Sequence, residues 1–318
     1  LRARTARRAL HAPRGHRTLV AGALPAPVTA AGDGDPLGLF SSCLPGWDAA
    51  HVIEIARSLE FAVIEWGAGP SDAIELGQDG PWLRERCAAA RVGISGLSVQ
   101  DEDVTITAPR RALPYVRLAS ALGARFIRLF APPYKGGSLA GEQRTARDGL
   151  DAIVEEAEAV GVAVLIETSP ATLAPTPGLA AALVDHQPPD RAGILFDPGN
   201  TVIEGYVQPA LALARMGPHL HHVHVKNIAW RNGSGGWAWR HASLTGGLLS
   251  WPDILGALAA AGYRGGYSID HLSGKPTRGR LRSETEALRG LLRDASSPAG
   301  SAGNDSIEKG ATPSPASA

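Results

Sequence analysis

Short apolar runs alternate with amphipathic stretches between residues 37 and 295 of this chain. Most of these runs are too short for stable helices and are rich in Val, Ile and Leu, as is typical of parallel strands that are buried on both faces. Eight of them are predicted to be strands: residues 37–41, 61–65, 92–99, 125–130, 162–167, 193–197, 220–225 and 266–269.

The stretches between these runs carry the marks of helices. Asp48 is placed to cap the first helix, Pro81 suits a first helical turn, and Gly123 and Gly161 stand where helices end. Apolar side chains recur three and four residues apart in the longer stretches, which indicates one buried face for each helix. Helices are predicted over residues 49–59, 82–90, 113–122, 146–160, 179–185, 209–216, 251–261 and 283–294.

A strand followed by a helix, repeated around the whole chain without a strand-only region, predicts a single-domain α/β fold, the closed (β/α)8 TIM barrel. The alternative is an open, doubly wound sheet. That fold usually has a glycine-rich loop after its first strand, where this chain reads SSCLPGW, and no G-x-G-x-x-G or P-loop pattern occurs. The barrel is therefore expected to span residues 37–295.

The two ends differ in composition from the barrel. Residues 1–36 are expected to be a disordered or processed segment, and residues 296–318 a disordered tail, because both are poor in large apolar side chains. An export signal is the weaker reading of the first segment, since Pro25 and Pro27 interrupt the apolar stretch that follows the arginine pair.

Composition narrows the classes of partner. The formal net charge is zero, with 31 basic and 31 acidic side chains, so no global field attracts nucleic acid or an anionic membrane. Apolar residues make up 44% of the chain, but no run approaches the length of a membrane span. Cys43 and Cys87 have no metal-type spacing and form no disulfide framework, which fits the cytoplasm. A homo-oligomer is compatible with these features.

Ionisable residues end most of the predicted strands. They stand where a TIM barrel places its functional groups, and an isolated buried charge is costly unless it has a partner or a metal. These residues are Glu65, Arg128, Glu167, Asp197, His224 and Asp270.

Alternation along four adjacent strands directs one such group from each strand to a common rim. Glu167, Asp197, His224 and Asp270 each share a face with small or apolar residues that would fill the barrel. Three carboxylates and one imidazole, without sulfur, favour one divalent ion: Mn²⁺, Mg²⁺ or Co²⁺, with Zn²⁺ as a further option. The sequence therefore predicts a metal site at this rim.

The segments VLIET, LFDPGN, HVHVKN and GY-(x)4-SIDH, together with FAVIEW on the second strand, resemble the sugar phosphate isomerase/epimerase family with xylose-isomerase-like TIM barrels. The resemblance spans most of residues 37–295. It implies that Glu167, Asp197, His224 and Asp270 bind the metal, and that Glu167 and Asp270 exchange protons with carbon. The chain departs from the family where a glutamate is usual and Asp270 stands, and where the residue after the lysine is Asn227 rather than aspartate.

The leading hypothesis is a divalent-metal-dependent isomerase or epimerase that acts on a ketose, an aldose or a polyol-derived keto sugar through an enediolate. Side chains expected to bind or orient the sugar are Glu65, Trp66, Arg128, Asn200, Lys226 and Arg231, with Trp47, Tyr134 and Trp230 as stacking candidates. A metal-dependent lyase or dehydratase that acts on a keto-inositol or an oxidised glycoside is the alternative.

Two further classes are more remote. An abasic-site endonuclease would need histidines from several strands, and none occurs between His51 and His186. A non-catalytic binding protein is the last class, and it is favoured if Asp270 is not a ligand.

Overall fold

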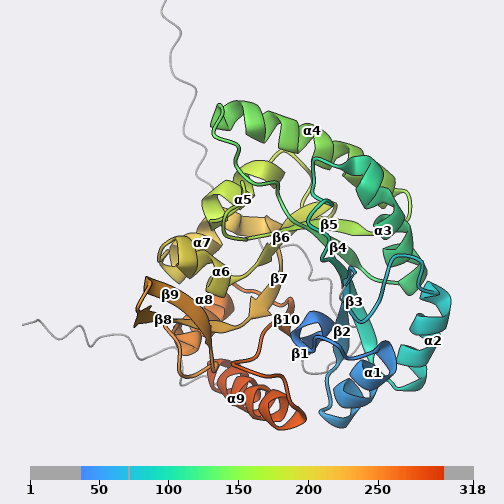
Figure 1. Cartoon of the computed structure of the whole chain (residues 1–318). Helices are drawn as coiled ribbons and strands as arrows, with labels where there is room; N and C mark the ends of the chain where they lie inside the picture. Colours follow the sequence, from blue (N-terminus) through green and yellow to red (C-terminus); the bar gives the residue numbers. More distant parts are fainter. Residues whose placement is uncertain (1–36, 71, 297–318) are drawn as a thin grey trace, which may run out of the picture.

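The computed structural model describes residues 37–70 and 72–296. The predictions made for residues 1–36 and 297–318 lie outside the described residues. Eight parallel strands close into a barrel in the order β1-β10-β7-β6-β5-β4-β3-β2, so the predicted (β/α)8 architecture is confirmed (Figure 1). The barrel strands are β1 Leu37–Phe40, β2 Val63–Ala68, β3 Gly93–Val99, β4 Phe126–Leu129, β5 Ala163–Glu167, β6 Ala192–Phe196, β7 Leu220–Val225 and β10 Gly266–Ile269.

The second strand lies later in the chain than predicted. Phe61 and Ala62 still belong to the turn that follows α1, in which Glu60 has a positive φ of 57°. The strand then continues past Glu65 because Trp66, Gly67 and Ala68 pair with β3.

The helices surround the strands. Five of the eight predicted helices begin earlier than predicted, and the other three begin at the predicted residue. Asp48 and Thr176 cap helices by accepting hydrogen bonds from the backbone three residues later, and Ser138 starts α4 seven residues before the predicted start in the same way. The α-helices are α1 Ala49–Ser58, α2 Gly80–Ala89, α3 Pro109–Leu122, α4 Leu139–Glu158, α5 Pro177–Val184, α6 Pro198–Glu204, α7 Pro209–Met216, α8 Trp251–Ala260 and α9 Arg278–Ser296. Two short 3-10 helices, η1 Ser41–Cys43 and η2 Gly217–His219, complete the set.

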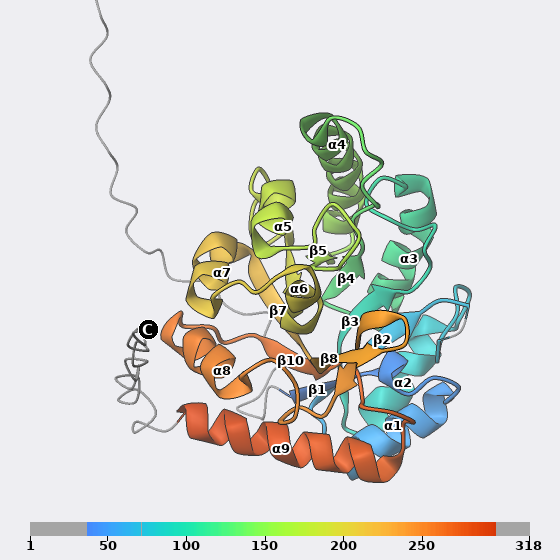
Figure 2. The same cartoon turned by 60° about the vertical axis from the view of Figure 1, so that its left-hand side comes forward.

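The last helix completes the outer ring. Figure 2 shows α9 running between α8 and α1. Its Arg289 donates hydrogen bonds to the carbonyls of Leu59 and Glu60, just after α1. No helix among the described residues is long and apolar enough to cross a membrane.

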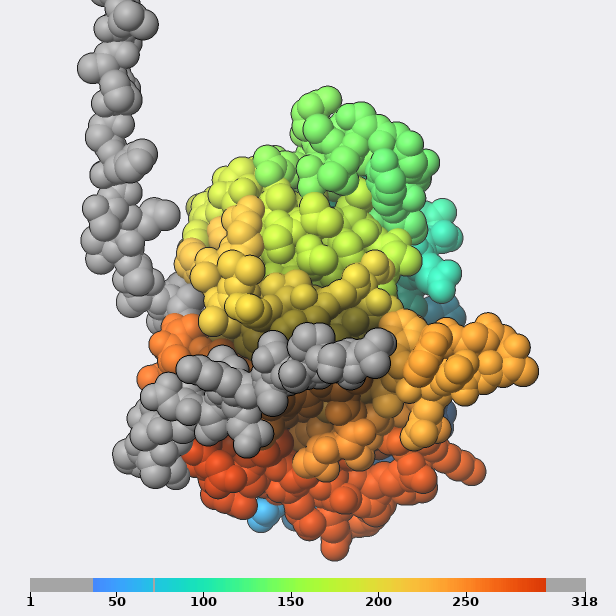
Figure 3. All heavy atoms as spheres, turned by 90° about the vertical axis from the view of Figure 1, so that its left-hand side faces the viewer, coloured from blue at the N-terminus to red at the C-terminus, as the bar shows by residue number. Residues whose placement is uncertain are grey.

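Two elements were not predicted. The first is α6, directly after the sixth strand, where Asp197 caps the helix by accepting a hydrogen bond from the Asn200 amide, with Pro198 in the first turn. The second is a two-stranded hairpin, β8 Asn227–Gly233 and β9 Gly236–Ala242, which follows β7 and is separate from the barrel sheet. Figure 3 shows this hairpin (orange) projecting from the body of the molecule.

The apolar core has two parts. The larger lies between strands and helices, and a small inner cluster fills the barrel. The inner cluster consists of Phe126, Ala163, Leu165 and Leu195. It forms an apolar floor, and the charged groups at the carboxyl ends of the strands lie above it.

Candidate metal centre

Three potential metal ligands meet at the carboxyl ends of β5, β6 and β7. Glu167 ends β5, Asp197 follows β6, and His224 lies near the end of β7. All three are buried, and one donor atom from each lies within 4.8 Å of the others. These three side chains therefore lie on the strand faces that the alternation of side chains predicts.

The His224 ring is oriented so that one nitrogen faces this cluster. Its Nε2 lies 2.9 Å and 3.1 Å from the two carboxylate oxygens of Glu65, and Phe40 stacks on the ring. Burial would lower the pKa of His224, but Glu65 and Asp270 raise it well above its usual value, so the ring is protonated when no metal is bound. Because Glu65 accepts the Nε2 proton, Nδ1 is the nitrogen whose lone pair becomes available to a metal once its own proton is released. Nδ1 is buried and has no hydrogen-bond partner, and it lies 3.6 Å from Glu167 Oε1.

Glu65 anchors this arrangement from inside the barrel. It is completely buried, Ser98 Oγ donates a hydrogen bond to it, and His222 Nε2 lies 3.3 Å away. Burial alone would raise the pKa of Glu65, but His224 and His222 hold that pKa well below its usual range. Glu65 therefore orients the candidate ligand and does not reach the open rim.

Glu167 is held on both of its oxygens. Asn200 Nδ2 donates to Oε1 at 3.0 Å, and Arg128 Nε forms an ion pair with Oε2 at 3.1 Å. Arg128 is fully buried, donates to the Val99 carbonyl at 2.8 Å and lies over the Phe130 ring. The structure thus places Asn200 and Arg128, both predicted to bind substrate, against a candidate ligand.

Asp197 divides its two oxygens between local structure and the site. Oδ1 accepts the Asn200 amide of α6 at 2.9 Å, which leaves Oδ2 facing the cluster, 3.9 Å from His224 Nδ1. Burial raises the pKa of Asp197 to about 6, against the attraction of Lys226. A nearby cation therefore favours the charged form of this carboxylate.

Lys226 and Asp270 complete the rim. Lys226 Nζ lies 2.7 Å from Asp197 Oδ2 and 2.7 Å from Asp270 Oδ2, and Asp270 Oδ1 lies 3.6 Å from His224 Nδ1. Burial would raise the pKa of Asp270, but Lys226 holds it below its usual range. Gly199 makes room for the lysine, since a Cβ there would stand 2.7 Å from Lys226 Cγ.

These residues fit a divalent cation. His224 Nδ1 is buried without a hydrogen-bond partner, although buried polar atoms are normally satisfied, and carboxylate oxygens of Glu167 and Asp197 lie 3.6 Å and 3.9 Å from it. Oxygen donors with one imidazole suit Mg²⁺, Mn²⁺ or Co²⁺. Asp270 does not belong to this group of three, but its Oδ1 lies 3.6 Å from His224 Nδ1, which makes it the candidate for a fourth ligand.

Several predicted site residues lie elsewhere. Trp66 is fully buried in the outer core beside Cys87 of α2, because it is on the opposite face of β2 from Glu65. Arg231 is exposed on the hairpin, and Trp47 packs near His51. Tyr134 is half exposed and donates to the Gly137 carbonyl. The prediction placed Trp66 by its proximity to Glu65 and did not apply the alternation that separates their side chains.

Sequence reasoning missed polar residues around the site. His271 follows Asp270, and its ring stacks on His241 of β9 with centroids 3.5 Å apart. Ser268 Oγ pairs with His222 Nε2 at 2.7 Å. The alternating WAWRHA segment was available as a strand pattern that would have located His241.

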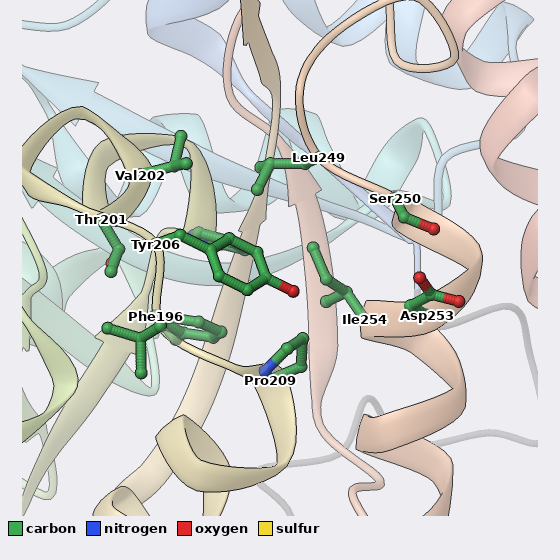
Figure 4. Close-up of a pocket in the computed structure, with 11 residues that line it drawn as sticks. Phe196, Thr201, Val202, Tyr206, Pro209, Leu249, Ser250, Asp253 and Ile254 are labelled. Carbon is green, nitrogen blue, oxygen red and sulfur yellow. The ribbon is translucent and has the colours of Figure 1, made fainter. Parts of the chain in front are cut away.

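An apolar pocket lies apart from this cluster. It opens between α6, α7 and α8, outside the barrel, with Tyr206 and Ile254 among the side chains that line it (Figure 4). Phe196 lines the pocket from β6, one position before Asp197, and alternation directs these two side chains to opposite sides. The pocket therefore does not reach the candidate metal centre.

Solved structures with the same fold place the chain among known barrels. A D-tagatose 3-epimerase-like protein shares 19% identity at a TM-score of 0.68, covering 81% of this chain and 97% of its own. A xylose isomerase-like TIM barrel protein from Mycobacterium smegmatis, in complex with magnesium, shares 19% at a TM-score of 0.61, covering 79% and 90%. A probable 3-DHS dehydratase from Bacillus anthracis shares 18% at a TM-score of 0.65, covering 80% and 98%.

Comparisons based on sequence give fewer matches than the comparison of structures. No curated protein matches the chain. The pattern that defines the xylose isomerase-like TIM barrel family matches residues 53–291, which is more than half of the chain. The closed barrel and this match together establish that the chain belongs to the xylose isomerase-like TIM barrel family.

Proposed function

We propose that the protein is a divalent-metal-dependent isomerase or epimerase of a small keto sugar or polyol. The observation that carries the proposal is the convergence of Glu167, Asp197 and His224, three buried residues at the barrel rim that each bring one donor atom within 4.8 Å of the others. The magnesium-bound and epimerase-like barrels of the same fold support it.

The metal, when bound, would supply a Lewis acid that stabilises negative charge developing on the sugar oxygens. The remaining work falls to the side chains. Glu167 is the proposed base that removes a proton from carbon, because Arg128 and Asn200 fix its carboxylate in one orientation. Asp270 is the proposed partner that returns a proton from the other side of the site.

Lys226 is proposed to hold a sugar oxygen. It is buried, and its ammonium already contacts Asp197 and Asp270. Burial would lower the pKa of Lys226, but the carboxylates Asp197, Asp270 and Glu167 raise it well above its usual value. The group is therefore a permanent cation and hydrogen-bond donor rather than a base.

The ligand assignment is tested on metal content. His224→Ala removes the one nitrogen donor, so we expect manganese content per chain to fall well below that of the wild-type protein while the circular dichroism spectrum is kept. A matched control is His186→Ala, which removes a histidine that pairs only with Asp151 at the surface. Equal manganese content in His224→Ala and the wild type would reject the site.

The reaction is tested by proton exchange in heavy water. The manganese-loaded protein is incubated with D-fructose, D-tagatose, L-ribulose and 2-keto-myo-inositol, and deuterium at carbon is followed by NMR. Glu167→Gln keeps a coordinating oxygen but cannot take a proton, so exchange is expected to slow by about 10² to 10⁴. Glu158→Gln, in a surface ion pair with Arg191, is the control. Exchange at the wild-type rate in Glu167→Gln would place the base elsewhere.

A lyase is the second candidate, and one observation favours it. Lys226 Nζ donates to Asp270 Oδ2 at 2.7 Å, so a carboxylate and an ammonium group that can stabilise a departing oxygen stand together at the rim. The dehydratase of the same fold is consistent with this alternative. Release of water from 2-keto-myo-inositol, seen as an unsaturated product in the same NMR experiment, would favour the lyase over the isomerase.

We also propose a small-molecule substrate and a reducing compartment. Cys43 and Cys87, the two cysteines of the chain, are both free and buried. Within the described residues, one group of potential metal ligands is present, Glu167, Asp197 and His224, and a single histidine does not resemble the histidine-rich multi-metal site of an abasic-site endonuclease.

A further inference from the structure

The β8–β9 hairpin concentrates aromatic side chains on one face. Residues directly opposite each other in an antiparallel pair share a face, and the register pairs Trp230 with Trp239, Asn232 with Trp237, and Ile228 with His241. These six residues form what we call the tryptophan face. The other face carries Arg231, Arg240 and small residues. Three of the seven tryptophans of the chain therefore stand on one side of a single hairpin.

The tryptophan face begins at the candidate metal centre. His241 stacks on His271 at 3.5 Å between centroids, and His271 directly follows Asp270. Trp239 meets His241 edge to face at 5.3 Å. Successive side chains on one face of a strand are roughly 7 Å apart, so the face leads from the rim outward past Trp239 to Trp237 over roughly 14 Å.

The base of the hairpin is fixed in place. Asn227 donates its side-chain amide to the carbonyls of Leu244 and Leu249 and accepts from the Leu249 amide. A Cβ at Gly247 would collide with this side chain, at 2.1 Å. The asparagine that replaces the usual aspartate thus anchors the hairpin, so the tryptophan face has a defined start beside the site.

In the part of the chain that the structure describes, all three tryptophans of the hairpin stay exposed over a third or more of their surface. Trp230, Trp237 and Trp239 are 37%, 67% and 41% exposed. Large aromatic side chains are exposed to water at a cost, and clusters of them mark binding surfaces. The aromatic face, rather than the face that carries the arginines, is therefore the one suited to stack against a ring.

We propose that the tryptophan face is a subsite for a second ring attached to the sugar at the metal centre, so that the natural substrate is a glycoside-like, two-ring molecule rather than a free monosaccharide. The inference rests on the proposed function, which supplies the first ring. The second ring needs an apolar face that can stack on tryptophan, which an aryl group and a second sugar both have.

A second copy of this chain is a poorer occupant than a substrate ring. Stable protein interfaces bury about 800 Å² on each partner, more than three half-exposed tryptophans on one narrow hairpin supply. The tryptophan face is also continuous with the site, because ring contacts lead from Trp239 to His241 and on to His271, the residue after Asp270.

The test compares binding of matched probes to the manganese-loaded full-length protein by isothermal titration calorimetry. The probes are D-fructose, lactulose and 4-O-benzyl-D-fructose, which share the keto sugar and carry no second ring, a second sugar and an aryl ring, respectively. We expect at least one ring-bearing probe to bind about tenfold more tightly than D-fructose, as one aromatic stack provides. Preference for the benzyl ether or for lactulose identifies the second ring as aryl or sugar.

The variants Trp237→Ala and Trp239→Ala should remove this difference and leave the binding of D-fructose unaffected. Trp82→Ala, which removes a similarly exposed tryptophan (43%) on α2, is the matched control and should keep it. In saturation-transfer NMR, protons of the second ring should lose their signal in the hairpin variants while those of the first ring keep it.

Three outcomes would overturn the proposal: no ring-dependent binding in the wild type, a ring preference that survives both hairpin variants, or light scattering that shows a dimer dissociating on Trp237→Ala. The proposed function fails separately. If the protein neither holds a metal nor exchanges protons, ring-dependent binding can still be measured. If it does both and no ring preference exists, the subsite alone is rejected.

Discussion

Glu65 and His224 are 159 residues apart in the chain, and the closed barrel brings Nε2 of the histidine to 2.9 Å from Oε1 of the glutamate. The contact crosses the barrel interior, since β2 and β7 are not neighbours in the sheet. It fixes which ring nitrogen is free to bind a metal. A buried glutamate on β2 therefore decides which nitrogen of a histidine on β7 faces the candidate metal centre.

We expect Glu65→Gln to weaken metal binding by about 10- to 100-fold, as removal of a residue that orients a ligand histidine typically does. The amide keeps the shape of the side chain but loses the charge that favours the Nε2 proton of His224. Manganese affinity of the metal-stripped protein, measured by calorimetry, checks this. Glu158→Gln serves as the surface control, and an unchanged affinity in Glu65→Gln would refute the orienting role.

Asp270→Glu should increase manganese affinity by about tenfold without abolishing turnover. The aspartate Oδ1 stops 3.6 Å from His224 Nδ1 while Oδ2 pairs with Lys226, and one more methylene would carry the carboxylate toward the other three donors. A lower affinity would mean that the short side chain is already the better ligand. Asp253→Glu, at an exposed position of α8, is the control for lengthening an acidic side chain by one methylene group.

Gly96→Ala should destabilise the barrel, whereas Gly256→Ala should not. A Cβ at Gly96 would stand 2.1 Å from the Phe126 ring, which fills the inner core, so we expect a loss of about 2 kcal/mol, or about 5 °C in Tm. A Cβ at Gly256 on α8 meets nothing within 4 Å, and alanine is the better helix former by about 0.5–1 kcal/mol. Thermal unfolding of both variants tests the pair, and an equal Tm for both would contradict the packing argument.

His221 should make the fold less stable in acid. Burial lowers the pKa of His221 to about 4, and a hydrogen bond with the Pro189 backbone only partly opposes this. The unfolded chain takes up a proton near pH 6.5, while the folded chain does not until about pH 4. Stability is therefore lost as the pH falls through this window, by at most about 3 kcal/mol. Urea unfolding at pH 7, 5.5 and 4 should show this loss relative to His221→Gln, and a constant difference between the two proteins would exclude it.

The strand positions were predictable because a barrel strand is buried on both faces and its apolar run is visible in one dimension. Placement of Glu167, Asp197 and His224 followed from alternation and the common rim of parallel strands. The contacts that individual side chains make in the folded protein could not be predicted from these patterns. Arg128 stands at a strand end like the ligands do, yet its length lets it fold back onto Glu167 and Val99 rather than toward the open rim.

The hairpin was missed for a different reason. Its strands carry polar and aromatic residues and bury little, so a search for apolar runs does not find them. Ser234 and Gly235 form a two-residue turn between paired glycines, and WAWRHA alternates strictly, which together predict a hairpin once exposed strands are considered. Elements that serve a ligand instead of the core leave this kind of pattern.

The pairing of β1 with β10 has a consequence for synthesis. Leu39 lies in register with Ile269, so the first described strand has one unpaired edge until about 230 further residues have been made. At ribosomal rates of about 5–20 residues per second, that interval lasts roughly ten to fifty seconds. Through that interval the growing chain carries an open strand edge of the kind that recruits other chains. A nascent barrel of this kind therefore has a long window in which a chaperone can bind before the ring closes.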